Sequence, residues 1–191
     1  MGPRVATAVR AFAAGGLAVY PTDTLFGLAA RATDPRALAR LVRAKGRPGG
    51  LPISVAVSSV PEVERLADLS PAARRFLRTH LPGPYTVLVR PSPGARRRLA
   101  PGLFADDGTL GLRVPDHAVA RELARVAGPI TATSANRHGE PPVSTDREAR
   151  RRFGPAVSVY LGGGPPPSGA PSRLIDLTGE APRAVARRRS P

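Results

Sequence analysis

The chain has 191 residues, a formal net charge of +15 and a sequence pI of about 11.7. It has no cysteine, which excludes disulfides, thiol catalysis and cysteine-ligated metal sites. No apolar run approaches the ~20 residues of a membrane span, and the start lacks the long apolar segment of a secretory signal. We therefore expect a soluble cytoplasmic protein with no membrane contact.

Hydrophobic periodicity and turn residues predict alternating helices and strands. In the first half we expect helices over 3–14, 34–45, 61–67 and 70–80, and strands over 17–20, 52–57 and 85–89. Asp34 and Ser70 are typical N-cap residues, and each precedes a proline at the first helical position.

In the second half, strands over 109–114, 129–133, 157–161 and 174–177 alternate with helices over 115–127 and 146–153. We expect an irregular basic stretch over 94–107, a mobile Gly/Pro-rich loop over 162–170 and a basic segment from Arg183. Several helices are short, which favours an α/β fold with a mixed, twisted sheet flanked by helices. We predict one domain over 1–185 and a short basic tail over 186–191.

One lysine and one asparagine stand out in a chain whose other basic side chains are arginines and which has no glutamine. Lys45 begins the run Lys-Gly-Arg-Pro that ends in Pro48, and Asn136 ends the run Thr-Ser-Ala-Asn after a predicted strand. Lys45 as a point charge and Arg47 as a bidentate fork suit a polyphosphate. Ser134 and Asn136 could bind phosphate oxygens or a base edge. Chance placement and ordinary loop hydrogen bonds remain the alternatives.

Further polar groups lie at the ends of other predicted strands, where ligands bind in open α/β sheets. Arg113 interrupts an apolar strand, so it must face a cleft or find a partner. A ligand carboxylate is one candidate partner and a structural aspartate is the other. Asp23 has the alternative role of capping a turn. The three histidines lack metal-ligand spacing, and the common phosphate-loop and dinucleotide motifs are absent.

Six segments together resemble the YrdC/TsaC family of threonylcarbamoyl-AMP synthases. They occur in the family's order over roughly residues 5–180. The segments are Tyr-Pro-Thr-Asp-Thr-Leu-Phe-Gly-Leu (20–28), Lys-Gly-Arg-Pro (45–48), Leu-Pro-Gly-Pro-Tyr-Thr (81–86), Gly-Leu-Arg-Val-Pro-Asp (111–116), Thr-Ser-Ala-Asn (133–136) with Gly-Glu-Pro (139–141), and Pro-Ser (171–172) before Ile-Asp-Leu (175–177).

The resemblance implies a YrdC-like fold with a concave, positively charged cavity. It implies condensation of L-threonine, bicarbonate and ATP into threonylcarbamoyl-AMP and pyrophosphate, with Mg²⁺ accompanying the ATP. A downstream transferase would then move the threonylcarbamoyl group to an adenosine of tRNA. Direct binding of tRNA or double-stranded RNA stays open at this point.

Carried over by position, the resemblance also implies roles for ten residues. Lys45 and Arg47 would be catalytic and would meet the triphosphate. The ATP-binding set is Lys45, Arg47, Thr109, Ser134, Asn136 and Pro142. The threonine-binding set is Thr24, Arg113, Ala132 and Ser172. No residue is expected to be a protein ligand of a metal.

The chain departs from the family pattern at a few positions: Leu51, Ala56, Arg173, and the segment 186–189, where Arg187 is a loose match. We also expect no second domain of the kind that the longer family branch has. Two other functions remain open. One is a carbamoyltransferase-like domain that handles carbamoyl-adenylate, and the other is a non-catalytic RNA-binding module, which the charge would suit.

Overall fold

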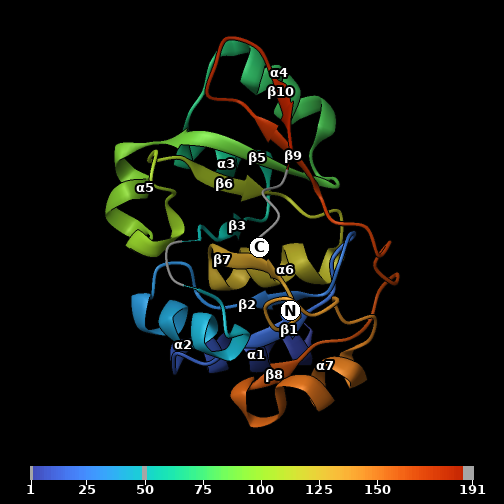
Figure 1. The fold of residues 1–191 in the computed structure, drawn as a ribbon. Coiled ribbons are helices and arrows are strands. Elements are labelled where there is room, and N and C mark those ends of the chain that lie inside the picture. Colours follow the sequence, from blue (N-terminus) through green and yellow to red (C-terminus); the bar gives the residue numbers. More distant parts are fainter. Residues whose placement is uncertain (1, 49–50, 187–191) are drawn as a thin grey trace.

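The computed structural model describes residues 2–48 and 51–186 (Figure 1). The helices are α1 (Pro3–Ala13), α2 (Pro35–Lys45), α3 (Val60–Leu66), α4 (Pro71–His80), α5 (Pro93–Arg98), α6 (Ala118–Ala127) and α7 (Asp146–Phe153), with short 3₁₀ turns η1 (Pro101–Leu103) and η2 (Gly154–Ala156). The strands are β1 (Ala18–Tyr20), β2 (Gly27–Ala29), β3 (Ser54–Ala56), β4 (Ala67–Asp68), β5 (Tyr85–Pro91), β6 (Leu110–Arg113), β7 (Ile130–Ser134), β8 (Val159–Tyr160), β9 (Arg173–Asp176) and β10 (Arg183–Val185).

These strands form one mixed sheet in the part of the chain that the structure describes. Its order is β10-β9-β5-β6-β3-β7-β2-β1-β8, and β4 pairs with β5 beside this path. The pairs β1/β8, β3/β6 and β5/β9 are parallel and the others are antiparallel. The predicted mixed sheet flanked by helices is confirmed, and Figure 1 shows it running from β10 to β8 through the molecule.

Apolar side chains cover both faces of this sheet. Along β1, Val19 belongs to the core that packs against α2 to α5 and α7, whereas Ala18 and Tyr20 belong to the core against α1 and α6. This division follows from the pleat, because successive side chains of a strand point to opposite faces. The strands are therefore held rigidly, and polar side chains at their ends have fixed positions.

The cap residues locate two helices well. The carboxylate of Asp34 accepts from the backbone N–H groups of Arg36 and Ala37 at 2.8 and 3.2 Å. The hydroxyl of Ser70 accepts from Ala73 N at 3.2 Å. These bonds satisfy backbone donors that have no partner inside the helix, and α2 and α4 begin at the predicted prolines.

One prediction from the sequence is wrong, and three strands were missed. Residues 94–107 are not irregular throughout, because Ser92 caps α5 through Ala95 N at 3.2 Å and η1 follows. Strands β2, β4 and β10 were not expected, and each has only two or three residues. β2 pairs with β1 and with the distant β7, β4 pairs with β5, and β10 pairs with the preceding strand β9. Most of the predicted tail over 186–191 lies outside the described residues.

None of the helices within 2–48 and 51–186 has the length and apolar character that a membrane span requires.

Candidate active site

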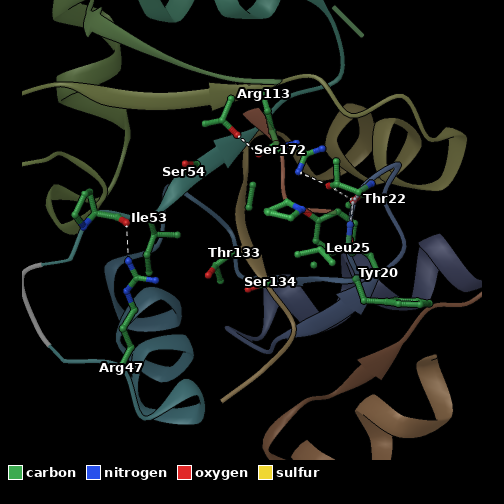
Figure 2. A pocket seen from close by; sticks show the side chains of 17 residues that line it. Tyr20, Thr22, Leu25, Arg47, Ile53, Ser54, Arg113, Thr133, Ser134 and Ser172 are labelled. Carbon is green, nitrogen blue, oxygen red and sulfur yellow. Dashed lines mark hydrogen bonds between the residues drawn. The ribbon is translucent and has the colours of Figure 1, made fainter. Parts of the chain in front are cut away.

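An open cavity of about 710 Å³, its mouth included, lies where β1, β2, β3, β5, β6 and β7 approach one another. Figure 2 shows its lining: Tyr20, Thr22, Thr24, Leu25, Phe26, Gly27, Arg47, Pro52, Ile53, Ser54, Thr86, Arg113, Ala132, Thr133, Ser134, Pro171 and Ser172. Six of the ten predicted site residues are in this lining, namely Thr24, Arg47, Arg113, Ala132, Ser134 and Ser172. Segments far apart in the sequence therefore share one hollow.

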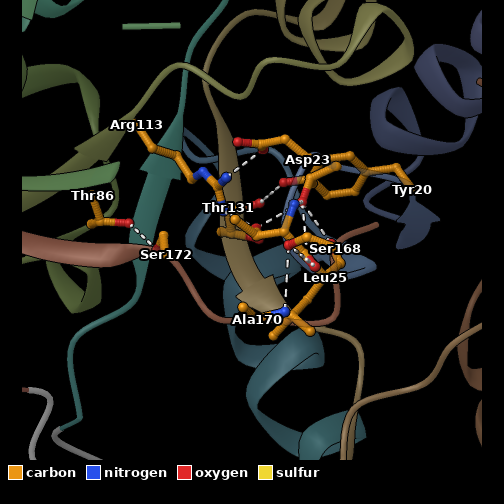
Figure 3. Close-up of polar contacts among 11 residues, drawn as sticks. Tyr20, Asp23, Leu25, Thr86, Arg113, Thr131, Ser168, Ala170 and Ser172 are labelled. Atoms are coloured by element: carbon orange, nitrogen blue, oxygen red, sulfur yellow. Dashed lines mark hydrogen bonds and ion pairs between the residues drawn. The ribbon is translucent and has the colours of Figure 1, made fainter. Parts of the chain in front are cut away.

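Arg113 lies at the end of β6 and forms a buried ion pair. Its Nη2 donates to Asp23 Oδ1 at 2.7 Å and its Nη1 donates to Thr24 Oγ1 at 3.0 Å (Figure 3). The side chains of Arg113 and Asp23 are only 9% and 13% exposed. Arg113 thus pairs with a structural aspartate and also lines the cavity, so the two alternatives left open by the sequence are compatible.

The Arg113–Asp23 pair retains unused hydrogen-bonding capacity. Arg113 Nε and Asp23 Oδ2 are both buried, and neither has a hydrogen-bond partner among the described residues. A guanidinium has five N–H donors, of which the contacts above use two. Arg113 can therefore bind a ligand carboxylate while it keeps Asp23.

The turn before β2 is shaped by Thr22 rather than by Asp23. The Thr22 hydroxyl accepts from the backbone N–H groups of Thr24 and Leu25 at 3.1 and 3.2 Å and donates to Leu25 O at 2.6 Å. Among the described residues, the Asp23 carboxylate accepts from Arg113 and makes no capping bond. Beside the turn, burial raises the pKa of Tyr20 to about 12, and its hydroxyl donates to Thr131 O at 3.2 Å. This neutral phenol adds no charge to the cavity.

Lys45 and Arg47 leave the end of α2 in different directions. Gly46 ends the helix with φ of +60°, a left-handed conformation that glycine adopts without strain. Arg47 lines the cavity, and its Nη2 donates to Pro52 O at 3.0 Å (Figure 2). Lys45 is 3% exposed and is not in the lining. Burial lowers the pKa of Arg47, and burial together with the Arg47 charge lowers the pKa of Lys45 to about 8.

Ser172 reaches the cavity from the segment before β9. Its hydroxyl lies 2.8 Å from that of Thr86 on β5 (Figure 3). The preceding loop over 162–170 packs onto the Thr22 turn, since Ser168 N donates to Asp23 O at 3.2 Å and Gly169 N donates to Thr24 O at 2.9 Å. We call Thr24, Arg113 and Ser172, which share this part of the lining, the Arg113 end.

Four predicted site residues do not line the cavity: Lys45, Asn136, Thr109 and Pro142. Thr109 precedes β6, at the opposite end of the strand from Arg113, and bonds to Asp107 Oδ1 through its N and Oγ1 at 2.9 and 2.7 Å. Pro142 is exposed. Their roles stay predictions, and the position of Thr109 gives its predicted role no support.

Sequence reasoning assigned no role to several residues in the lining. Ser54 and Thr86 are hydroxyl residues within otherwise apolar strands, and both face the cavity. A lone polar residue in a buried strand is the signal that could have found them. Of the departures from the family pattern, Leu51 is partly buried, Ala56 is fully buried and Arg173 is exposed, and none of them is in the lining.

The strong positive charge expected of the cavity stays a prediction. Two guanidinium groups line it, but that of Arg113 is paired with a carboxylate. We call Arg47 and Ser134 the Arg47 end, because Arg47 is its cation. Over the described ranges, no group of three or more His, Cys, Asp or Glu side chains could hold a metal ion.

Comparisons with known proteins agree with this arrangement. The Sua5/YciO/YrdC family model, described as "Telomere recombination", matches residues 10–189. A Mycobacterium tuberculosis protein is 40% identical over 95% of this chain and 82% of its own length. A Methylobacillus flagellatus protein named threonylcarbamoyl-AMP synthase is 39% identical over 85% of this chain and 89% of its own length.

Among solved structures, Sua5 of P. abyssi complexed with L-threonine matches with a TM-score of 0.85 and 30% identity. The match covers 94% of this chain and 52% of that protein, so the chain spans about half the length of this relative. The family match, the sequence identities and the shared fold agree. The chain belongs to the Sua5/YciO/YrdC family.

Proposed function

We propose that the chain is an L-threonylcarbamoyladenylate synthase, which condenses L-threonine, bicarbonate and ATP into threonylcarbamoyl-AMP and pyrophosphate. Relatives named for this activity match it over most of their length, which supports the proposal. The observation that carries it is the meeting of the Arg113 end and the Arg47 end in one cavity. One end suits an amino acid and the other suits a phosphate chain.

Threonine would bind at the Arg113 end. The remaining N–H donors of Arg113 suit an α-carboxylate, since a guanidinium matches carboxylate geometry. The hydroxyls of Thr24 and Ser172 lie in the same lining and can bond to the polar groups of the amino acid. Ala132 is also in the lining, beside the strand end that bears Ser134.

ATP would bind with its phosphates at the Arg47 end. Arg47 brings a positive charge and Ser134 brings a hydroxyl, both of which favour phosphate oxygens. Mg²⁺ would arrive on the ATP phosphates, as it commonly does. When bound there, it would help to neutralise the charge of the phosphates.

The proposed chemistry needs no covalent attachment to the protein. The neutral amine of threonine attacks bicarbonate with loss of water, or attacks CO₂ with loss of a proton, and forms a carbamate. A carbamate oxygen then attacks the α-phosphorus of ATP, and the bond to pyrophosphate breaks. The protein contributes by holding the reactants together and by placing Arg47 where charge develops on the leaving group.

We further propose that the product supplies a transferase that modifies an adenosine of tRNA, because a mixed carbamic–phosphoric anhydride is an activated acyl donor. A free acyl-adenylate hydrolyses readily, so rapid transfer to the next enzyme is expected. Binding of tRNA or double-stranded RNA by this chain belongs to the same proposal. Its net charge of +15 supports an encounter with RNA.

Pyrophosphate release tests the proposal. The protein is incubated with ATP, Mg²⁺ and bicarbonate, with and without L-threonine, and a third mixture contains carbamoyl phosphate in place of threonine and bicarbonate. Release that depends on threonine, with threonylcarbamoyl-AMP in the mixture, is the expected result. Release without threonine, driven by carbamoyl phosphate, would instead assign carbamoyl-adenylate chemistry. No release, combined with tight and salt-sensitive RNA binding, would assign a non-catalytic RNA-binding module.

A further inference from the structure

Lys45, the single lysine of the chain, bonds to one turn through both its side-chain ammonium and its backbone carbonyl. The Lys45 ammonium donates to Ser134 O at 2.6 Å, to Asn136 O at 2.9 Å and to Asn136 Oδ1 at 3.1 Å. Its backbone carbonyl accepts from His138 N at 2.8 Å. We call residues 134–138 the Ser-Ala-Asn turn. The side chain of Lys45 thus ties the end of α2 to the end of β7.

These contacts occupy the ammonium fully. An ammonium has three N–H donors, and the turn supplies three oxygen acceptors at hydrogen-bonding distances. A phosphate that bound Lys45 directly would have to displace at least one of these three acceptors, so its gain would be reduced by the hydrogen bond that is lost. Arg47, by contrast, lines the cavity, and its guanidinium donates to Pro52 O.

The carboxamide of Asn136 is also engaged within the turn. Its Oδ1 accepts from Lys45 and from Ser134 Oγ, the latter at 2.5 Å. Its Nδ2 donates to Arg137 O and to Glu140 O, both at 2.8 Å. Asn136 therefore acts as the centre of a small network and, like Lys45, is absent from the cavity lining. Ser134 is the one member of the network that reaches the cavity.

The residue type explains why a lysine remains here among so many arginines. Three oxygens converge on one atom, and a compact ammonium with tetrahedral donors fits that arrangement. A planar guanidinium spreads its donors over a wider fork and would not fit the same space. The unusual residue is thus accounted for by the shape of the turn, without any ligand.

We infer that Lys45 is a positioning residue, which with Asn136 holds the Ser-Ala-Asn turn so that Ser134 faces the triphosphate, and that Arg47 is the cation that contacts it. This inference rests on the proposed function only in taking ATP as the ligand of the turn. The lysine acts through the turn in the ligand-free protein, before any nucleotide arrives.

The composition of the chain makes this testable with one NMR signal. Asn136 is the only asparagine and there is no glutamine, so a ¹⁵N spectrum contains one side-chain amide pair from these residue types. In ligand-free protein, Lys45→Met should shift this pair and speed its hydrogen exchange by about tenfold or more, because the carboxamide loses a charged partner. The matched control, Arg47→Met, should leave both the shift and the exchange unchanged.

An unchanged Asn136 signal in folded Lys45→Met would overturn the inference. A second measurement on the wild-type protein decides the matter if that variant does not fold. The single lysine is labelled with ¹⁵N at Nζ, and a coupling through a hydrogen bond between this nitrogen and the phosphorus atoms of bound ATP is measured in the presence of Mg²⁺. A positioning role predicts no such coupling, whereas direct phosphate contact would produce one.

The two proposals fail in different ways. If ATP shifts no resonance of the protein at all, the proposed function falls, and the ligand-free measurement on Lys45→Met still decides the role of the lysine. If ATP binds and the Lys45 nitrogen couples to its phosphorus, the proposed function stands, and the lysine is a phosphate ligand.

Discussion

The two ends of the cavity use their cations in opposite ways. At the Arg113 end, the cation lines the cavity and keeps a buried aspartate as a permanent partner. At the Arg47 end, the arginine lines the cavity. A second cation, Lys45, lies nearby but outside the lining, and its ammonium donates to two backbone oxygens and one carboxamide oxygen. A lone charge in a sequence motif can therefore serve either the ligand or the residues that hold the ligand's site.

The difference has a physical basis in what each cation must compensate. The positive charge of Arg113 is largely offset by the carboxylate of Asp23, so Arg113 serves a ligand mainly through its directed N–H donors. Among the described residues, Arg47 donates to the backbone oxygen of Pro52 and forms no ion pair, so it can offer its full charge to phosphates. We therefore expect substitutions at the Arg113 end to affect both stability and threonine use, and substitution of Arg47 to affect mainly ATP use.

The largest effect is expected for Arg113→Leu. It removes a ligand contact and leaves Asp23 buried without its partner, which costs about 3–5 kcal/mol of unfolding free energy. The kcat/KM for threonine should fall about 10- to 100-fold, the equivalent of losing one charged hydrogen-bonded contact. Urea unfolding and steady-state kinetics measure the two effects.

Arg183→Leu is the matched control for this variant. Its guanidinium pairs with Asp176 at 3.1 Å, but the arginine side chain is 78% exposed. An exposed pair contributes about 1 kcal/mol or less, so both stability and kinetics should change little. Equal destabilisation by the two variants would refute the claim that burial makes the Arg113 pair important.

Arg47→Met should raise the KM for ATP by about 10- to 100-fold, because a charge-assisted contact with phosphate is lost. The melting temperature should stay close to that of the wild type. Arg43→Met provides the same change of charge at an exposed site on α2 and should leave the KM unchanged. Comparable KM values for the two variants would mean that Arg47 acts only through overall charge.

The pH dependence of stability distinguishes Lys45 from an ordinary exposed lysine. Burial and the Arg47 charge lower its pKa from 10.5 to about 8. Between these values the unfolded chain binds more protons than the native state, so unfolding free energy rises with pH in this window. From pH 7.5 to 9.5, urea unfolding should show the wild type gaining roughly 1–2 kcal/mol relative to Lys45→Met. A constant difference across this range would show that the Lys45 pKa is close to ordinary.

The smallest effect on activity is expected from substitutions in the loop over 162–170, which bonds to the Thr22 turn. Gly164 has φ of +77°, and a Cβ there would lie 2.6 Å from Cε1 of the buried His117 ring. Gly164→Ala should displace the loop and raise the KM for threonine a few-fold, since Ser168 and Gly169 hold the Thr22 turn. Gly163→Ala is strained in the same way, with φ of +98°, but meets no atom within 4 Å. If both variants behave alike, backbone strain and not the His117 contact controls the loop.

Much of the fold could be predicted from local signals. The caps at Asp34 and Ser70 located α2 and α4, because a side-chain bond to backbone N–H groups is encoded within four residues. Strand β2 escaped prediction because Gly27, Leu28 and Ala29 have little strand preference of their own. They form a strand because β1 and β7 lie on either side of them.

The same distinction between local signals and tertiary contacts applies to the candidate site. By itself, the sequence determined which segments carry chemistry, since the unusual residues and polar strand ends are visible in it. Only the tertiary structure decided which side chains face the cavity, because that depends on contacts between residues about ninety positions apart. Arg113 meets Asp23 and Lys45 meets Asn136 in this way. The direction in which a charged group points follows from the partners that satisfy it, and the fold supplies those partners.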